Sequence, residues 1–305
     1  MYHFICKHKK ITYILITPIL DTQILDNGDL KCWGQDSLGT LGNGGNDTDT
    51  DSVPDLPIDL GEGRTAIAVE SGLESACAIL DDGSLKCWGS DERGQLGDGG
   101  FVDYFERGAN LSAPSTTTSV DLGDGRFAVK VRLGAYHTCA ILDNGDVKCW
   151  GAGSNGKLGY GHPSVPGNPN QRSVWSAPPN RSIYLGESRI AVDICTGMDH
   201  TCAMLDDGSV KCWGRNGQGQ LGIGETSNIA VEYAPNRAVE FGVNRTAIAI
   251  ACGWHHTCAV LDDGSIKCWG SNYHGELGIG QTYSQTENKY VRCVRAHVNR
   301  ITYSF

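Results

Sequence analysis

The chain has 305 residues and a formal net charge of −10, from 25 Lys and Arg against 35 Asp and Glu. Binding to a phosphate backbone needs clustered cations, and no basic stretch extends beyond His8-Lys9-Lys10, so we expect no nucleic-acid partner. Glycine is abundant, with 41 residues, and hydrophobic residues make up 40% of the chain. This composition favours many short strands joined by tight turns and disfavours a helical bundle.

Residues 1–23 do not resemble the rest of the chain, and we treat them as a leader or a non-homologous segment. Basic residues up to Lys10 precede the apolar run from Ile11 to Leu20, which is the layout of a signal peptide. No small-residue cleavage site follows, however, and Pro18 interrupts the run. A strand fragment, or a foreign leader joined to a truncated array, explains the segment equally well. The run is too short to span a bilayer as a helix, so we expect no transmembrane segment.

One sequence unit recurs five times after this segment. Its copies begin at Ile24, Cys77, Cys139, Cys202 and Cys258, and read ILDNGDLKCWG, CAILDDGSLKCWG, CAILDNGDVKCWG, CAMLDDGSVKCWG and CAVLDDGSIKCWG. Their tryptophans, Trp33, Trp88, Trp150, Trp213 and Trp269, follow one another at intervals of 55 to 63 residues. Such a period indicates an array of stacked copies of one small structural unit.

Each unit carries two hairpin signals separated by a segment of variable length. In the third unit they predict four strands rich in Val, Ile, Ala and aromatic residues, at Ser119–Leu122, Arg126–Leu133, Tyr136–Leu142 and Asp146–Gly151. Four-stranded antiparallel sheets repeated around an axis form a β-propeller, in which stacked blades bury both faces of each sheet. We therefore predict an all-β propeller over residues 24–280, followed by a divergent tail at 281–305.

The turn chemistry also predicts the register of each hairpin. If Asp81, Asp82 and Gly83 form a three-residue loop, with Gly83 at positive φ, then Cys77 lies directly opposite Cys87. The same spacing pairs Cys139 with Cys149, Cys202 with Cys212, and Cys258 with Cys268. Because four units keep both cysteines, we expect disulfides, each worth about 2–3 kcal/mol. The alternative is that they are reduced and act as small buried hydrophobic residues.

The remaining cysteines and the histidines give weaker signals. Zinc-binding cysteines usually come in two closely spaced pairs, which cysteines ten residues apart do not match, so we expect no metal and no other cofactor. Cys6, Cys32, Cys195, Cys252 and Cys293 have no partner in the repeat. The recurring His137, His200 and His256 are best explained by hydrogen bonds to neighbouring loops, because a residue present in each unit usually serves the unit itself.

The pattern GxxHTCAxLxxGxxKCWGxxxxGxLG, clearest at 134–159, 197–222 and 253–278, resembles the regulator of chromosome condensation repeat family. The resemblance covers residues 24–280. It implies a propeller that typically has seven blades, of which five are visible here, so we expect a partial ring. Known functions in the family are nucleotide exchange on a small GTPase, chromatin contact and ligase-associated scaffolding, and related propellers inhibit β-lactamases. These functions lie on loops that differ among members, so no functional residue is transferred.

No phosphate-binding loop, nucleophile elbow or His-Glu-x-x-His motif occurs, so we predict that the protein is not an enzyme. The Asp-rich turns at Asp81, Asp143, Asp206 and Asp262 lack the ligand frame of a calcium loop and are explained by turn chemistry. Glycosylation sequons at Asn46, Asn110, Asn180 and Asn244, together with the cysteine pattern, favour a secreted or lumenal glycoprotein over a cytoplasmic or nuclear one.

The variable segments between the hairpins are the candidate binding surface, because insertions in radial arrays collect there. The two longest carry Phe101, Tyr104, Phe105 and Trp175, and exposed aromatic residues are common anchors of protein recognition. The alternative is that these rings pack against their own loops. We therefore expect a scaffold that binds a protein or glycan partner, with an intracellular exchange factor or scaffold for a small GTPase as the alternative.

Overall fold

The computed structural model describes residues 11–16, 20–36, 38–44, 50, 52–99, 118–160, 174–175, 177–224, 226, 237–280 and 292–294. Apart from one short 3-10 turn, η1 (Ser154–Gly156), the regular secondary structure in these ranges consists of β-strands. The fold class predicted from the sequence, all-β, is confirmed. The described part of the chain contains no helix with the length and hydrophobicity needed to span a bilayer.

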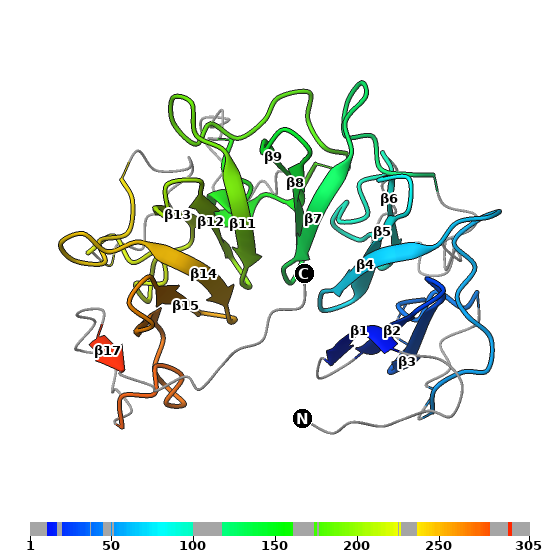
Figure 1. The fold of residues 1–305 in the computed structure, drawn as a ribbon, viewed down its shortest axis with the longest axis horizontal. Helices are drawn as coiled ribbons and strands as arrows, with labels where there is room; N and C mark the ends of the chain where they lie inside the picture. Colours follow the sequence, from blue (N-terminus) through cyan, green and yellow to red (C-terminus); the bar gives the residue numbers. More distant parts are fainter. Residues whose placement is uncertain are drawn as a thin grey trace. The chain divides into compact units, whose positions relative to one another are not determined.

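The strands form five antiparallel sheets, which we call blades 1 to 5 in chain order (Figure 1). Blade 1 contains β1 (Ile11–Ile16), β2 (Leu20–Leu25) and β3 (Leu30–Gly34). Blade 2 contains β4 (Ala66–Ser71), β5 (Ser75–Leu80) and β6 (Leu85–Gly89). Blade 3 contains β7 (Ala128–Leu133), β8 (His137–Leu142), β9 (Val147–Ala152) and β10 (Val174–Trp175).

Blade 4 contains β11 (Ala191–Thr196), β12 (His200–Leu205) and β13 (Val210–Gly214). Blade 5 contains β14 (Ala247–Cys252), β15 (His256–Leu261), β16 (Ile266–Gly270) and β17 (Arg292–Val294). The chain divides into two compact units. Unit 1 comprises Met1–Asp143, Val147–Gly153 and Arg172–Arg181, and holds the strands of blades 1 to 3. Unit 2 comprises Asn144–Asp146, Ser154–Gln171 and Ser182–Phe305, and holds those of blades 4 and 5.

The register of the hairpins agrees with the sequence prediction. In blade 2, Ile79 lies opposite Leu85, and Cys77 lies opposite Cys87. The loop between them is closed by a 2.9 Å hydrogen bond from the Leu80 amide to the Ser84 carbonyl, and Gly83 has a φ of +80°. Because only glycine adopts this conformation without strain, the turn, and with it the register, is determined locally.

The number of strands per unit differs from the prediction. Ser119–Leu122 is not a strand, and three strands recur in every blade; the fourth strand of blades 3 and 5 is the short β10 or β17 at the other edge of the sheet. The Val120 amide donates one hydrogen bond to the Leu85 carbonyl of blade 2, whereas the Leu122 carbonyl accepts one from Lys148 Nζ of blade 3. The segment thus passes from one sheet to the next, and a crossing segment cannot form a continuous ladder with either.

Two short pairings fall in segments that we separated from the propeller. β1 lies in the segment interpreted as a leader, and it pairs with β2 as the first strand of blade 1. β17 lies in the segment interpreted as a divergent tail, and it pairs with β16. In both places the structure extends a sheet with the neighbouring chain.

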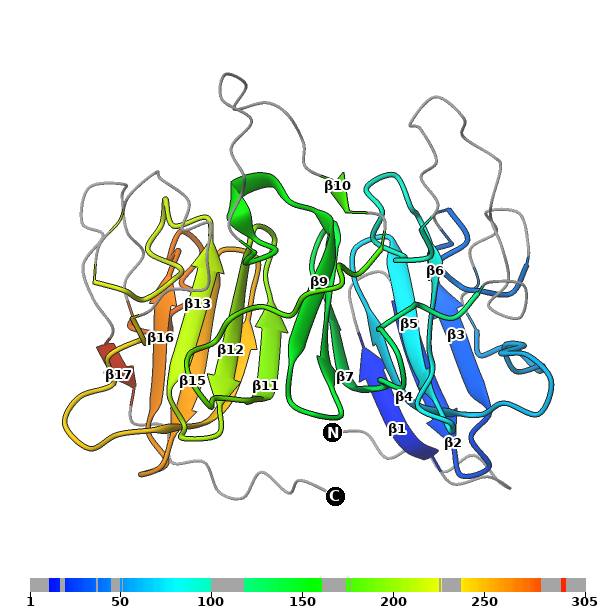
Figure 2. The ribbon, with the colours of Figure 1, turned by 90° about the horizontal axis from the view of Figure 1, so that it is seen from above.

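The hydrophobic core lies between consecutive sheets of the same unit. One cluster joins Leu30 of blade 1 to Trp88 of blade 2, and a second joins Ile79 of blade 2 to Trp150 of blade 3. In unit 2, Val210 of blade 4 and Trp269 of blade 5 belong to one cluster. The face-to-face packing expected of stacked blades is therefore present within each unit, and Figure 2 shows how the strands of each blade lie side by side.

Candidate functional site

The tryptophans of the repeated motif join blades 2 to 5 to a turn that precedes each of them in the chain and lies in the same unit. Their indole N–H groups donate hydrogen bonds of 2.9–3.0 Å to a carbonyl oxygen in the turn before a Leu-Gly pair. The pairs are Trp88 with Thr40, Trp150 with Gln95, Trp213 with Lys157, and Trp269 with Gln220. These four indoles are almost fully buried, so their role is structural.

The threonine that precedes the first cysteine of a hairpin contacts the same carbonyl. The hydroxyl of Thr138 donates to the Gln95 oxygen at 2.8 Å, and that of Thr201 to the Lys157 oxygen at 2.9 Å. Thr257 donates to the Gln220 oxygen at 3.0 Å. Each carbonyl therefore accepts two hydrogen bonds, which satisfies both of its lone pairs in the interior.

His200 extends this network within unit 2. Its Nε2 lies 2.9 Å from the Thr257 hydroxyl oxygen, and because that hydroxyl donates to Gln220, Nε2 must carry the proton. Burial, with smaller contributions from the neighbouring His255 and His256, lowers the pKa of His200 to about 3. A neutral, buried histidine that bonds the next blade fits the structural role predicted for His200.

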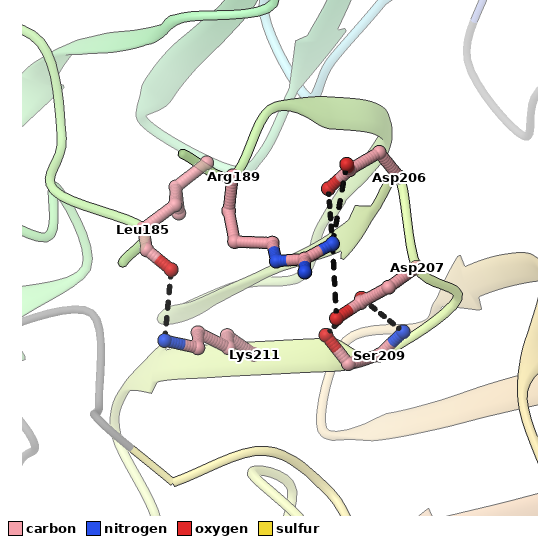
Figure 3. A network of polar contacts seen from close by, with 6 residues as sticks. All are labelled: Leu185, Arg189, Asp206, Asp207, Ser209 and Lys211. Atoms are coloured by element: carbon pink, nitrogen blue, oxygen red, sulfur yellow. Dashed lines mark hydrogen bonds and ion pairs between the residues drawn. The ribbon is translucent and has the colours of Figure 1, made fainter. Parts of the chain in front are cut away.

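Each Asp-rich turn is held by an arginine of the same repeat, as Figure 3 shows for blade 4. Arg189 contacts Asp206 at 3.2 Å and Asp207 at 3.3 Å. A hydrogen bond from the Ser209 hydroxyl lowers the pKa of Asp207, and the Arg189 charge adds to the lowering. Equivalent ion pairs join Arg64 to Asp81, Arg126 to Asp143, and Arg245 to Asp262. These carboxylates are occupied in stabilising the hairpin.

The lysine of the Lys-Cys-Trp-Gly motif is used in the same way. Lys211 Nζ donates to the Leu185 carbonyl at 2.8 Å (Figure 3), and Lys267 Nζ donates to the Phe241 carbonyl at 2.7 Å. Burial lowers the pKa of Lys211. The lysine therefore fastens the segment that enters the blade to the last strand of its hairpin.

The four predicted cysteine pairs lie at bonding distance. Their Sγ atoms are 2.06–2.11 Å apart, for Cys77 and Cys87, Cys139 and Cys149, Cys202 and Cys212, and Cys258 and Cys268. Cys32 is buried and is the one free cysteine among the residues whose side chains the structure describes, because Thr22 stands opposite it. Burial raises the pKa of the Cys32 thiol far above its usual range.

A fifth pair was not predicted. Cys195 of blade 4 and Cys252 of blade 5 have their sulfurs 2.05 Å apart, although they are 57 residues apart in sequence. The repeat predicts no partner for either cysteine, because neither position is a cysteine in the other repeats. The signal that sequence reasoning could have used is that both stand near the end of the first strand in adjacent repeats.

A large aliphatic residue is exposed at a β-bulge in each first strand from blade 2 to blade 5. The hydrogen-bonded ladder skips the second residue of each of these strands. The skipped residues are Ile67, Val129, Val192 and Ile248, which are 63%, 52%, 44% and 59% exposed. Bulges of this kind redirect a side chain out of the regular face of the sheet. The bulges provide apolar contact points on both units that the sequence analysis did not identify.

The predicted aromatic anchors cannot be placed on this surface. Phe101, Tyr104 and Phe105 lie outside the described residues. The backbone of Trp175 forms part of β10, which pairs with β9, but its side chain is also outside the described part. Their role as binding residues remains a prediction.

Comparison with known proteins identifies the family. The profile of the RCC1-like domain matches residues 20–303, which is nearly the whole chain. The chain belongs to the RCC1-like domain family. This agrees with the resemblance to the regulator of chromosome condensation repeats, and it extends the match beyond residues 24–280.

Among curated proteins, this RCC1-like chain is similar to two proteins of Arabidopsis thaliana. It is 29% identical to the ultraviolet-B receptor UVR8, over 88% of this chain and 54% of UVR8. It is also 29% identical to the mitochondrial RCC1 domain-containing protein RUG3, over 88% of this chain and 56% of RUG3. The chain therefore spans a little over half the length of these relatives.

Solved structures show the same fold at lower sequence identity. Human WBSCR16 matches with a TM-score of 0.75 and 19% identity, over 94% of this chain and 67% of that one. Prp20p of Saccharomyces cerevisiae matches with a TM-score of 0.73 and 16% identity, over 95% of this chain and 64% of that one. The structures matched are seven-bladed RCC1 propellers, so the predicted propeller class is confirmed.

Proposed function

We propose that this RCC1-like domain is a non-catalytic scaffold that binds a protein partner through the variable segments between its hairpins. The observation that carries the proposal is that the repeated polar side chains are already engaged inside the fold. The tryptophan, threonine, arginine and lysine of the motif each contact a defined group of the same or the adjacent blade. The variable segments between the hairpins differ from repeat to repeat, so they are able to recognise one particular partner.

A protein partner is favoured by the apolar residues that the described surface presents. Ile67 and Val129 in unit 1, and Val192 and Ile248 in unit 2, are each between 44% and 63% exposed. Protein interfaces bury apolar and aromatic side chains at their centre, whereas sugars are bound through polar groups and individual rings. A glycan partner is thus the less favoured form of the proposal.

The test uses a partner recovered by affinity capture on the intact protein and then purified. Phe105→Ala and Trp175→Ala should each weaken its binding by about tenfold or more, because truncating an aromatic anchor removes most of its contact area. Binding would be measured by calorimetry and folding by thermal unfolding. If both variants bind the partner with the affinity of the wild-type protein, and their unfolding temperatures are unchanged, the variable segments do not carry the site.

The bulge residues supply a matched comparison. Ile67→Ala and Val129→Ala shorten exposed side chains without opening a cavity, so neither should change stability by more than about 0.5 kcal/mol. If these two variants lose the partner while Phe105→Ala and Trp175→Ala retain it, binding occurs at the first strands instead of the variable segments.

The alternative is an intracellular exchange factor or scaffold for a small GTPase. It is supported by the fold of Prp20p, whose reported binding properties concern Gsp1p and histones, although 16% identity shows the fold alone. Acceleration of nucleotide release from a small GTPase by the purified domain would establish it. This alternative also predicts reduced cysteines throughout, which labelling of the native protein with a thiol reagent would detect.

We further propose an extracellular or lumenal location. The five cysteine pairs at bonding distance favour an oxidising compartment, where such bonds persist. Asn180 and Asn244 are exposed, as glycosylation requires, whereas Asn46 and Asn110 lie outside the described residues. Expression through a eukaryotic secretory pathway should produce glycan that a glycosidase removes, and the amount should fall in Asn180→Gln and Asn244→Gln.

A further inference from the structure

Four cysteine sulfurs meet where blades 4 and 5 pack together. Cys195 of β11, Cys202 of β12 and Cys212 of β13 are cross-strand neighbours and form one row across blade 4. Cys252 of β14 reaches this row from blade 5 and bonds Cys195. The Sγ atoms of Cys195, Cys202 and Cys252 all lie within 4.8 Å of one another. Two disulfides therefore lie beside each other.

The bonding state of the four sulfurs decides which chemistry this cluster supports. A soft metal ion would bind thiolates, but in the structure all four sulfurs are already bonded in pairs. A disulfide sulfur is instead an electrophile, which a thiolate attacks in line with the bond that breaks. Adjacent disulfides can thus exchange partners once a single thiolate is generated among them.

Burial determines where an external thiol can begin. Cys202 and Cys212 are completely buried and Cys195 is 5% exposed, whereas Cys252 is only partly buried. Cys252 is therefore the most accessible residue of the cluster, and we expect a small thiol to attack its Sγ first. The Cys202–Cys212 bond is protected from direct attack by the packing of the two blades.

We propose that Cys252 is a reaction site for thiol reductants, and that Cys195 passes the exchange on to the buried Cys202–Cys212 disulfide. The reductant thiolate attacks Cys252 Sγ, forming a mixed disulfide and releasing Cys195 as a thiolate. The Cys195 thiolate then attacks Cys202 Sγ, forming a Cys195–Cys202 bond and releasing Cys212 as a thiolate. Cys195 and Cys202 are register partners, so the new bond joins adjacent strands of one blade.

The electrons balance with a dithiol as the reductant. Its second thiol displaces Cys252 from the mixed disulfide, leaving Cys252 as a thiolate and the dithiol as a cyclic disulfide. The two thiolates, Cys252 and Cys212, take up the two protons that the dithiol gives up. The bond within blade 4 thereby moves from Cys202–Cys212 to Cys195–Cys202, and the covalent link between blades 4 and 5 is lost.

The chain provides a matched control in blade 3. Cys139 and Cys149 form the same cross-strand pair and are both completely buried, like Cys202 and Cys212. Arg132 occupies the position that Cys195 has in blade 4, since Arg132 pairs with Cys139 as Cys195 pairs with Cys202. Within the described residues, the blade 4 cluster is the one group of three close metal-ligating side chains, and blade 3 has no such third sulfur.

The experiment treats the oxidised full chain with a limiting amount of dithiothreitol, quenches with acid, alkylates free thiols and maps the bonds by mass spectrometry without reduction. Trypsin cleaves after Arg189 and Lys211, so one peptide contains both Cys195 and Cys202, while Cys212 lies on the next. We expect alkylated Cys252 and Cys212, together with an internal bond in the Cys195–Cys202 peptide. Cys212 should be labelled on the order of tenfold faster than Cys149.

The double variant Cys195→Ser/Cys252→Ser removes the entry site and keeps the buried bond. In this variant Cys212 should be labelled no faster than Cys149. Equal labelling rates of Cys212 and Cys149 in the wild-type protein would overturn the proposal, as would the absence of the internally bonded peptide. The wild-type measurement decides the matter by itself if the double variant does not fold.

Discussion

The indole nitrogen of Trp150 lies 3.0 Å from the carbonyl oxygen of Gln95, which belongs to the turn that follows blade 2. This hydrogen bond brings Gly97 against the tryptophan ring. A Cβ atom added at Gly97 would lie 2.4 Å from Trp150 Nε1, far inside van der Waals contact. The Leu-Gly pair of the motif is thus explained by the space that the next blade requires.

We expect Gly97→Ala to destabilise unit 1 by about 2–4 kcal/mol, because it combines a strained backbone with displacement of a buried tryptophan. Gly99→Ala is the matched control, since Gly99 has a similar positive φ of +81° but nothing within 4 Å of the added carbon. That variant should cost only about 1 kcal/mol, for the backbone alone. Chemical denaturation of both variants tests the difference, and equal losses would refute the packing explanation.

Thr22→Cys should supply the disulfide that blade 1 lacks. Thr22 lies directly opposite Cys32, is completely buried, and its hydroxyl has no hydrogen-bond partner. The substitution removes an unsatisfied polar atom and closes a loop of the same length as in the other blades, which is worth about 2–3 kcal/mol. The unfolding temperature should rise under oxidising conditions and the gain should disappear with reductant. Thr22→Ser, which keeps the hydroxyl and forms no bond, is the control.

The buried ion pair between Lys157 and Asp199 should be a major stabilising contact of unit 2. Lys157 Nζ lies 2.8 Å from the Asp199 carboxylate, and the two side chains are 2% and 14% exposed. In the turns that follow blades 2 and 4, the position equivalent to Lys157 is a glutamine, Gln95 or Gln220. Lys157→Gln should therefore cost about 3 kcal/mol, because it leaves a buried carboxylate without its main partner. Adding Asp199→Asn should recover part of this loss in a double-mutant cycle.

The same ion pair predicts a dependence on pH. Burial by itself would raise the pKa of Asp199, but the charges of Lys157 and Arg215 hold it below its usual range. The stabilisation is therefore present above the unfolded pKa of about 4 and is lost as the pH falls through the lower folded value. The stability difference between wild type and Lys157→Gln should shrink in acid. A difference that stays constant down to pH 2 would contradict this explanation.

Asp91→Asn should stabilise the protein at neutral pH. Burial is the main cause that raises the pKa of Asp91 to about 7; the hydrogen bond from the Leu96 amide opposes this rise, and the charge of Asp98 adds to it. The unfolded chain loses this proton near pH 4, so wild-type stability should fall by on the order of 2 kcal/mol as the pH rises from 4 to 7. Asparagine should remove that fall.

The other blades show that asparagine is accommodated at this position. Asp91 accepts a hydrogen bond from the Leu96 amide. Asn216 accepts the equivalent bond from the Leu221 amide, and Asn272 accepts it from the Leu277 amide. Thermal unfolding of Asp91→Asn between pH 4 and pH 8 checks the prediction. The variant and the wild type should converge in acid, and a gain that does not vary with pH would point to a different cause.

The local features of this fold were predictable from the sequence because they depend on residues close together in the chain. The turn at Asp81, Asp82 and Gly83 determines which residues face each other, and so it places Cys77 opposite Cys87. The composition of the strands likewise indicated an all-β repeat. The fourth strand was wrong because Val120 and Leu122 bond to different sheets, which no local pattern reveals.

Which distant residues meet depends on how the sheets pack in three dimensions. Trp150 and Gln95 are 55 residues apart and Cys195 and Cys252 are 57 apart, and each pair meets because neighbouring sheets stack face to face. A hairpin is set by the stiffness of a few backbone angles, so the cysteine pairs within blades could be predicted from the sequence alone. Contacts between blades depend on how two whole surfaces pack, so the cluster around Cys202 emerged from the fold.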